Sequence, residues 1–163
     1  MIHTTLCYVI QDGRYLMLHR VKKKNDANED KWIGIGGKFE DKESPEDCML
    51  REFREETGCL LTDYRYRGIV TFVSDRFETE YMHLFTASRY EGVLSTCDEG
   101  VLEWIPKDRL SSLHLWEGDR VFFDLLEKNI PFFSLKLVYQ GDRLEKAILN
   151  GQPLPLPYSG AFS

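Results

Sequence analysis

Residues 36–59 read GGKFEDKESPEDCMLREFREETGC and carry the start and stop signals of one helix. Ser44 can cap the first turn, and Pro45 suits the first helical position. Gly58 suits the left-handed residue that follows a helix end. The stretch therefore predicts a helix over residues 45–57. Its helical period places Met49 and Phe53 on an apolar face that borders a strip of carboxylates.

The strip consists of Glu52, Glu55 and Glu56, which fall within an arc of about 100°. Arg51 lies beside them and can pair with Glu55 one turn later. One interpretation is a solvated acidic face on a surface helix. The other is a site for a hard divalent cation such as Mg²⁺, which takes oxygen ligands and completes its shell with water and substrate phosphate. The helix considered alone leaves both interpretations open.

The larger pattern resembles the Nudix box, and the chain is identified on it as a member of the Nudix family. The spacing matches at every fixed position, although Phe53 and Cys59 stand where aliphatic residues are more usual. The matching residues are Gly37, Glu43, Arg51, Glu52, Phe53, Glu55, Glu56, Gly58 and Cys59.

The resemblance implies hydrolysis of a nucleoside diphosphate linked to another moiety, with Mg²⁺ or Mn²⁺ as the cofactor. By matching positions, it implies that Glu52, Glu55 and Glu56 are metal ligands, that the Gly36 carbonyl adds another, and that Arg51 orients the strip. Glu99, in the segment CDEG, resembles a glutamate that MutT-like members bring to the metals from outside the box. Its alternative interpretation is a loop acid before a strand. Glu55, Glu56 and Glu99 are the candidates for the general base.

Two further segments resemble the 8-oxo-dGTP diphosphatases of this family: WIGIGGK at 32–38 and LWEGD at 115–119. They imply that Lys38 contacts phosphates, that Trp116 stacks on a purine and that Asp119 hydrogen-bonds the purine edge. Ile33 stands where the mammalian member has an asparagine that contacts the base. The alternatives are that Trp116 is a core residue and that Asp119 caps a helix.

Lys23, in the basic segment 22–24, is a further candidate for phosphate binding, with a basic surface loop as the equal alternative.

The rest of the sequence predicts an α+β protein, with the Nudix fold and a mixed β-sheet sandwiched between helices. Asp12-Gly13 predicts a hairpin between strands at 3–10 and 14–20. We expect a short strand broken by glycines at 32–37, further strands at 63–76, 79–90 and 101–105, a helix at 119–130, and a hairpin that turns at Gly141-Asp142. Residues 1–163 read as a single domain, with an irregular tail over 151–163.

Composition excludes several classes of function. The net charge of −6 argues against a polymeric nucleic-acid partner. The N-terminus does not resemble a signal peptide, and the sequence has no apolar run of the roughly 20 residues that would span a membrane. The four cysteines form no CxxC pair, which favours reduced thiols in the cytoplasm. We expect a monomer or a homodimer that acts on a small nucleotide.

Three hypotheses follow. The first is hydrolysis of a purine nucleoside triphosphate, with 8-oxo-dGTP foremost, to the monophosphate and pyrophosphate. The second keeps the chemistry but changes the substrate to ADP-ribose, a dinucleoside polyphosphate or another modified nucleotide. The third is a catalytically silent module that senses a nucleotide, and the complete set of box glutamates argues against it.

Overall fold

A computed structural model describes residues 1–21, 28–95 and 100–162. Its elements confirm the predicted α+β class. The helices are α1 (Pro45–Thr57), the 3₁₀ turn η1 (Lys107–Ser112) and α2 (Asp119–Glu127). The strands are β1 (Ile2–Gln11), β2 (Arg14–His19), β3 (Trp32–Ile33), β4 (Leu60–Ser74), β5 (Glu80–Glu91), β6 (Val101–Pro106), β7 (Phe133–Gln140), β8 (Arg143–Leu149) and β9 (Gln152–Pro153).

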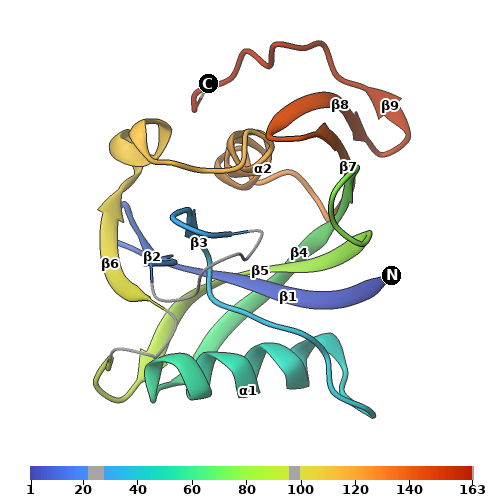
Figure 1. The fold of residues 1–163 in the computed structure, drawn as a ribbon. Coiled ribbons are helices and arrows are strands. Elements are labelled where there is room, and N and C mark those ends of the chain that lie inside the picture. The colour runs from blue at the N-terminus through green and yellow to red at the C-terminus, as the bar shows by residue number, and fades with distance from the viewer. Residues whose placement is uncertain (22–27, 96–99, 163) are drawn as a thin grey trace.

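The strands form a mixed sheet in the order β3-β2-β1-β5-β4-β7-β8-β9, and β6 pairs with β2. The pairs β1–β5 and β4–β7 are parallel, whereas the other pairs are antiparallel. Figure 1 shows α1 on one face of the sheet and α2 on the opposite face. Because side chains alternate along a strand, β1 contributes to both cores: Cys7 packs in the α1 core, and Tyr8 packs in the α2 core.

Helix α1 has the bounds that its sequence predicts. The Ser44 hydroxyl accepts a hydrogen bond from the Asp47 amide at 3.0 Å, and the Asp47 carboxylate accepts one from the Ser44 amide, also at 3.0 Å. This reciprocal capping box fixes the first turn. At the other end Gly58 is left-handed, with φ 76°. Met49 and Phe53 are buried against the sheet, as the periodicity predicts.

The strand predicted at 32–37 is shorter than expected. Only Trp32–Ile33 pairs as a strand, with β2, and the segment that follows lies against β1 through isolated bridges at Ile35 and Lys38. A Cβ atom on Gly36 would lie 1.8 Å from the Thr5 carbonyl oxygen, and one on Gly37 would lie 2.4 Å from the Glu52 carboxyl carbon. Residues 36 and 37 are glycines because the chain here passes between β1 and the acidic strip of α1.

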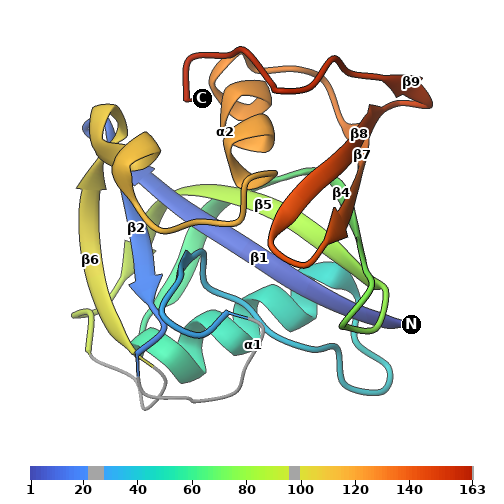
Figure 2. The ribbon, with the colours of Figure 1, turned by 45° about the horizontal axis from the view of Figure 1, so that its top comes forward.

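Several other boundaries also differ from the prediction by a few residues. Strand β4 begins at Leu60 rather than at residue 63. Helix α2 ends at Glu127 rather than at residue 130, because Asn129 takes a left-handed conformation with φ 52° shortly before Pro131. The tail predicted to be irregular contains the short strand β9 and then crosses over α2 (Figure 2).

The three cysteines of the described residues, Cys7, Cys48 and Cys59, are buried free thiols, as expected. In the same part of the chain, no helix is long and apolar enough to cross a bilayer.

Replacing Ser44 with alanine should destabilise the protein by about 1 kcal/mol, because the capping hydroxyl is lost and the Asp47 amide loses its acceptor. Urea unfolding measures the difference. Ser88→Ala is the control, since Ser88 lies on an exposed position of β5. Equal stability of the two variants would contradict the capping role.

Candidate active site

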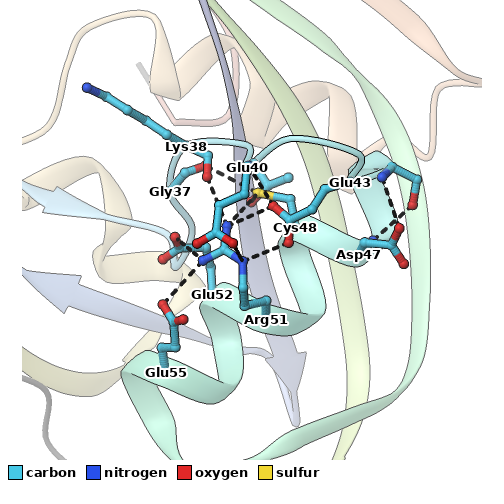
Figure 3. A network of polar contacts seen from close by, with 11 residues as sticks. Gly37, Lys38, Glu40, Glu43, Asp47, Cys48, Arg51, Glu52 and Glu55 are labelled. Carbon is cyan, nitrogen blue, oxygen red and sulfur yellow. Dashed lines mark hydrogen bonds and ion pairs between the residues drawn. The ribbon is translucent and has the colours of Figure 1, made fainter.

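Arg51 is the centre of a network of polar contacts beside the acidic strip (Figure 3). Its guanidinium binds Glu43 with two hydrogen bonds, of 2.7 Å from Nε and 2.9 Å from Nη2. Nη1 donates to Glu52 at 2.8 Å and to Glu55 at 3.3 Å. Nη2 also donates to the Lys38 carbonyl at 3.0 Å. One cation therefore orders three carboxylates and ties the helix to the glycine loop, and these hydrogen bonds lower the pKa of Glu43.

The three glutamates of the strip differ in their access to solvent. The Glu55 side chain is 57% exposed and the Glu52 side chain 16% exposed, whereas Glu56 is buried. The strip thus runs from solvent into the protein. A simple solvated acidic face would leave all three exposed, so this gradient favours the interpretation as a binding site.

The residues present fit a hard divalent cation. Their donors are carboxylate oxygens, which Mg²⁺ prefers. The carbonyls of Ile35 and Gly37 accept hydrogen bonds from β1, so the Gly36 carbonyl lies between two carbonyls that already have partners. In the described ranges no group of three or more His, Cys, Asp or Glu side chains is already arranged to hold an ion. Water and substrate phosphate would therefore complete the ligand shell.

A cavity of about 480 Å³ opens beside the same glycine loop, on the α2 side of the sheet. It brings together most of the residues that the sequence assigns to substrate, although they come from distant parts of the chain. These residues are Ile33, Lys38, Trp116 and Asp119, and Gly36, a predicted metal ligand, lines the cavity with them. Gly37 lines the cavity as well, so the loop borders both the cavity and the acidic strip.

Trp116 is buried in the α2 core and also forms part of the cavity wall, so its position is compatible with both predicted roles, and stacking on a purine stays a prediction. Its indole nitrogen donates to the Asn28 side chain at 3.0 Å. The Lys31 ammonium lies 4.5 Å from the centre of the ring, a cation–π contact. The ring also makes edge contacts with Phe72 and Tyr139. These contacts fix its orientation.

Asp119 does not cap α2, contrary to the alternative interpretation. Gly118 is the N-cap residue, and no side chain caps this helix. Asp119 is buried in the cavity wall, and burial raises the pKa of its carboxyl to about 8, although Arg120 and Lys31 act in the opposite direction. The raised pKa favours the protonated carboxyl, which can both donate and accept a hydrogen bond.

Two predicted site residues, Lys23 and Glu99, lie outside the described residues. Conversely, Arg20, Tyr8 and Asn28 line the cavity and were not predicted to bind substrate. Arg20 follows β2 directly, and a basic residue at a strand end shortly before the glycine loop is the signal that could have identified it.

The comparisons with known proteins agree with this geometry. The sequence profile of the NUDIX domain matches residues 2–126. The chain belongs to the Nudix family. The expected Nudix fold is thereby confirmed, and with relatives named as hydrolases the protein is a Nudix hydrolase.

This Nudix hydrolase is similar to three known proteins over most of its length. It is 34% identical over 132 residues to the oxidized purine nucleoside triphosphate hydrolase of Danio rerio, which covers 80% of this chain and 82% of that protein. It is 31% identical over 129 residues to an uncharacterized Nudix hydrolase, YvcI, of Bacillus subtilis, covering 76% and 78%. The crystal structure of a MutT protein from Bacillus halodurans superposes with a TM-score of 0.80 at 26% identity, covering 94% and 100% of the two chains.

Arg51→Lys should lower the free energy of unfolding of this Nudix hydrolase by about 1–2 kcal/mol at pH 7, because an ammonium cannot form the two-point bond to Glu43. The low pKa of Glu43 contributes stability above its ordinary value of 4.5 and loses it as the pH falls. The difference between variant and wild type should therefore shrink at pH 3. Urea unfolding at both pH values checks this, and a difference that grows at pH 3 would contradict it.

Asp119 should make the protein less stable as the pH rises. Its raised pKa means that the folded state favours the protonated carboxyl, so its contribution is complete below 3.8 and is lost as the pH rises to about 8. Between these values the expected loss is roughly 1.4 kcal/mol per pH unit. Asp119→Asn should remove this slope, which unfolding curves at pH 5–9 would reveal.

Asp124→Asn is a matched control for the Asp119 prediction. Asp124 is buried on the same helix, and burial raises its pKa, but hydrogen bonds from Tyr158 and Lys128 outweigh that effect and lower it. The Asp124→Asn variant should keep the wild-type slope between pH 5 and pH 9. A wild-type slope in Asp119→Asn as well would disprove the role of Asp119.

Proposed function

We propose that this Nudix hydrolase cleaves an oxidised purine nucleoside triphosphate, with 8-oxo-dGTP foremost, to the monophosphate and pyrophosphate in a reaction that requires Mg²⁺ or Mn²⁺. The observation that carries the proposal is the position of the Gly36–Lys38 loop, which borders the base-sized cavity and contacts the acidic strip. A substrate that spans this loop would have its base in the cavity and its phosphates beside the glutamates. The relative from Danio rerio bears the name of this activity.

The cavity suits a nucleoside. Its volume of about 480 Å³ lies within the usual range of small-molecule sites. Its lining includes aromatic side chains and the Asp119 carboxyl, which suit a flat heterocycle with polar edges. It also includes Arg20, Lys38 and the backbone of Gly36 and Gly37, which suit phosphate groups.

The residues of the strip divide the chemistry between them. A bound divalent cation would polarise a phosphoryl oxygen and neutralise negative charge that develops on it. Glu52, Glu55 and Glu56 would hold that cation, and the Gly36 carbonyl would assist. Arg51 keeps Glu52 and Glu55 in place through its Nη1. Either Glu55 or Glu56 would accept the proton of the attacking water, with Glu99 as the third candidate.

Ile33 supports a second candidate substrate. It lines the cavity where it offers the base no hydrogen bond. Recognition of an oxidised purine therefore depends on fewer polar contacts, and another nucleoside diphosphate derivative, such as ADP-ribose or a dinucleoside polyphosphate, is the alternative. The intact box glutamates favour either hydrolase over a module that only senses a nucleotide.

The test is a hydrolysis panel with 8-oxo-dGTP, dGTP, ADP-ribose and a dinucleoside polyphosphate, with products identified by chromatography. We expect 8-oxo-dGTP to have the highest kcat/KM and to yield pyrophosphate. EDTA should abolish turnover, and Mg²⁺ or Mn²⁺ should restore it, because hard cations bind oxygen ligands. Highest kcat/KM for ADP-ribose would transfer the assignment to the second candidate.

Glu55→Gln and Glu56→Gln should each reduce kcat by about 100-fold or more, because an amide lacks the charge that attracts the cation and cannot accept the proton. Glu103→Gln on β6 removes an exposed carboxylate elsewhere and should retain wild-type turnover. Circular dichroism confirms that each variant is folded. Turnover within a few-fold of wild type in both strip variants would refute their role.

A further inference from the structure

Tyr8 is a polar residue at an unusual place in the cavity wall. It lies on β1 and points to the α2 side, where its ring makes an edge contact with Phe123 at 5.2 Å between centroids. The tip of the ring lies against Gly34: a Cβ there would be 3.0 Å from the Tyr8 Cζ atom. Tyr8 is 0% exposed, and it lines the same cavity as Asp119. Tyr8 is therefore part of the cavity wall, and its hydroxyl is near enough to the Asp119 carboxyl for that group to raise its pKa.

The hydroxyl of Tyr8 has no hydrogen-bond partner of normal geometry among the residues that the structure describes. Leaving such a buried group unpaired is unfavourable for the folded state. Burial first, and then the nearby Asp119, raise the pKa of Tyr8 well above its ordinary value. The group thus remains a protonated O–H donor. Gly34 acts on the pKa in the opposite direction through its amide, which is itself a donor, so the Tyr8 proton still needs an acceptor.

Asp119 provides the second polar group in the cavity wall near Tyr8. Its carboxyl is buried in the wall and makes no side-chain hydrogen bond to the described residues. Ile33 adds apolar surface only. This part of the cavity wall, formed by Tyr8 and Asp119, therefore presents one obligate donor, from Tyr8, and one carboxyl that can donate or accept.

We propose that the Tyr8 hydroxyl is a specificity-determining group that donates a hydrogen bond to a ring nitrogen or carbonyl oxygen on the edge of the substrate's base, beside Asp119. The inference rests on the proposed nucleotide-binding role of the cavity. It restricts the substrate to bases whose inward edge carries an acceptor next to a group that pairs with a carboxyl. Since the hydroxyl has no surface open to solvent in the ligand-free fold, base entry requires a small outward movement of the wall.

Tyr15 provides a matched internal control. It is also 0% exposed, its hydroxyl also has no partner of normal geometry, and its ring packs edge-on against Phe123 at 5.5 Å and against Tyr8 at 6.0 Å. The one relevant difference is position, because Tyr15 is absent from the cavity wall. Removing either hydroxyl deletes one unpaired buried oxygen from the same aromatic cluster.

The experiment compares Tyr8→Phe with Tyr15→Phe in the full chain. Urea unfolding should show both variants as stable as wild type or more so, because each loses an unpaired buried group. Tyr8→Phe should raise KM for the preferred purine triphosphate about 5- to 10-fold with kcat within twofold, as expected for one neutral hydrogen bond made equally in ground and transition states. Tyr15→Phe should leave both constants within twofold of wild type.

Two results would overturn the assignment, and they differ in scope. If wild type hydrolyses purine triphosphates and Tyr8→Phe keeps the wild-type KM, Tyr8 does not contact the base, while the proposed function stands. If calorimetry shows that the wild type binds no purine nucleotide, the assignment and the proposed function both fail. An equal rise of KM in both tyrosine variants would show a general effect on packing, and it would also overturn the assignment.

Discussion

The guanidinium of Arg51 is the constraint on which the site depends. Four acidic side chains, Glu40, Glu43, Glu52 and Glu55, lie around it, and their mutual repulsion would otherwise spread them into solvent. Arg51 pairs with Glu43 at two points, reaches Glu52 and Glu55 through one nitrogen, and holds the Lys38 carbonyl through another. A single planar cation with five donors can satisfy these directions at once, which a lysine cannot do. The carboxylates are thereby held in a defined arrangement without full neutralisation of their charge.

The glycine loop connects the acidic strip on one face of the sheet with the cavity on the other face. Gly37 allows the Glu52 carboxylate to lie against the backbone, and Gly36 allows the loop to lie against Thr5 of β1. The same strand places Tyr8 in the cavity wall. The acidic strip and the cavity are thus separate features on opposite faces that share one loop, and a substrate longer than a nucleoside can reach both.

Local signals predicted more than long-range ones did. Helix α1 was predicted to the residue, because a capping serine, a proline and a terminal glycine all act within its own sequence. The box spacing likewise identified the residues that Arg51 orders. The parallel pairing of β1 with β5, which helps build the cavity, has no local signal, because the two strands are far apart in the sequence. The burial of Asp119 and the unpaired hydroxyl of Tyr8 follow from that packing, so sequence alone could not show them. The unpredicted end of α2 at Glu127 depended on the backbone of a single asparagine.

The face of α1 that Arg51 orders, together with the glycine loop, is the proposed site of the divalent cation. The most direct measurement is amide NMR during titration with Mn²⁺, because a paramagnetic ion broadens the signals of nearby residues. Our account predicts that the amides of 36–38 and 51–58 broaden first and that excess Mg²⁺ restores them. Broadening centred on another part of the molecule, or no broadening at millimolar Mn²⁺, would contradict it.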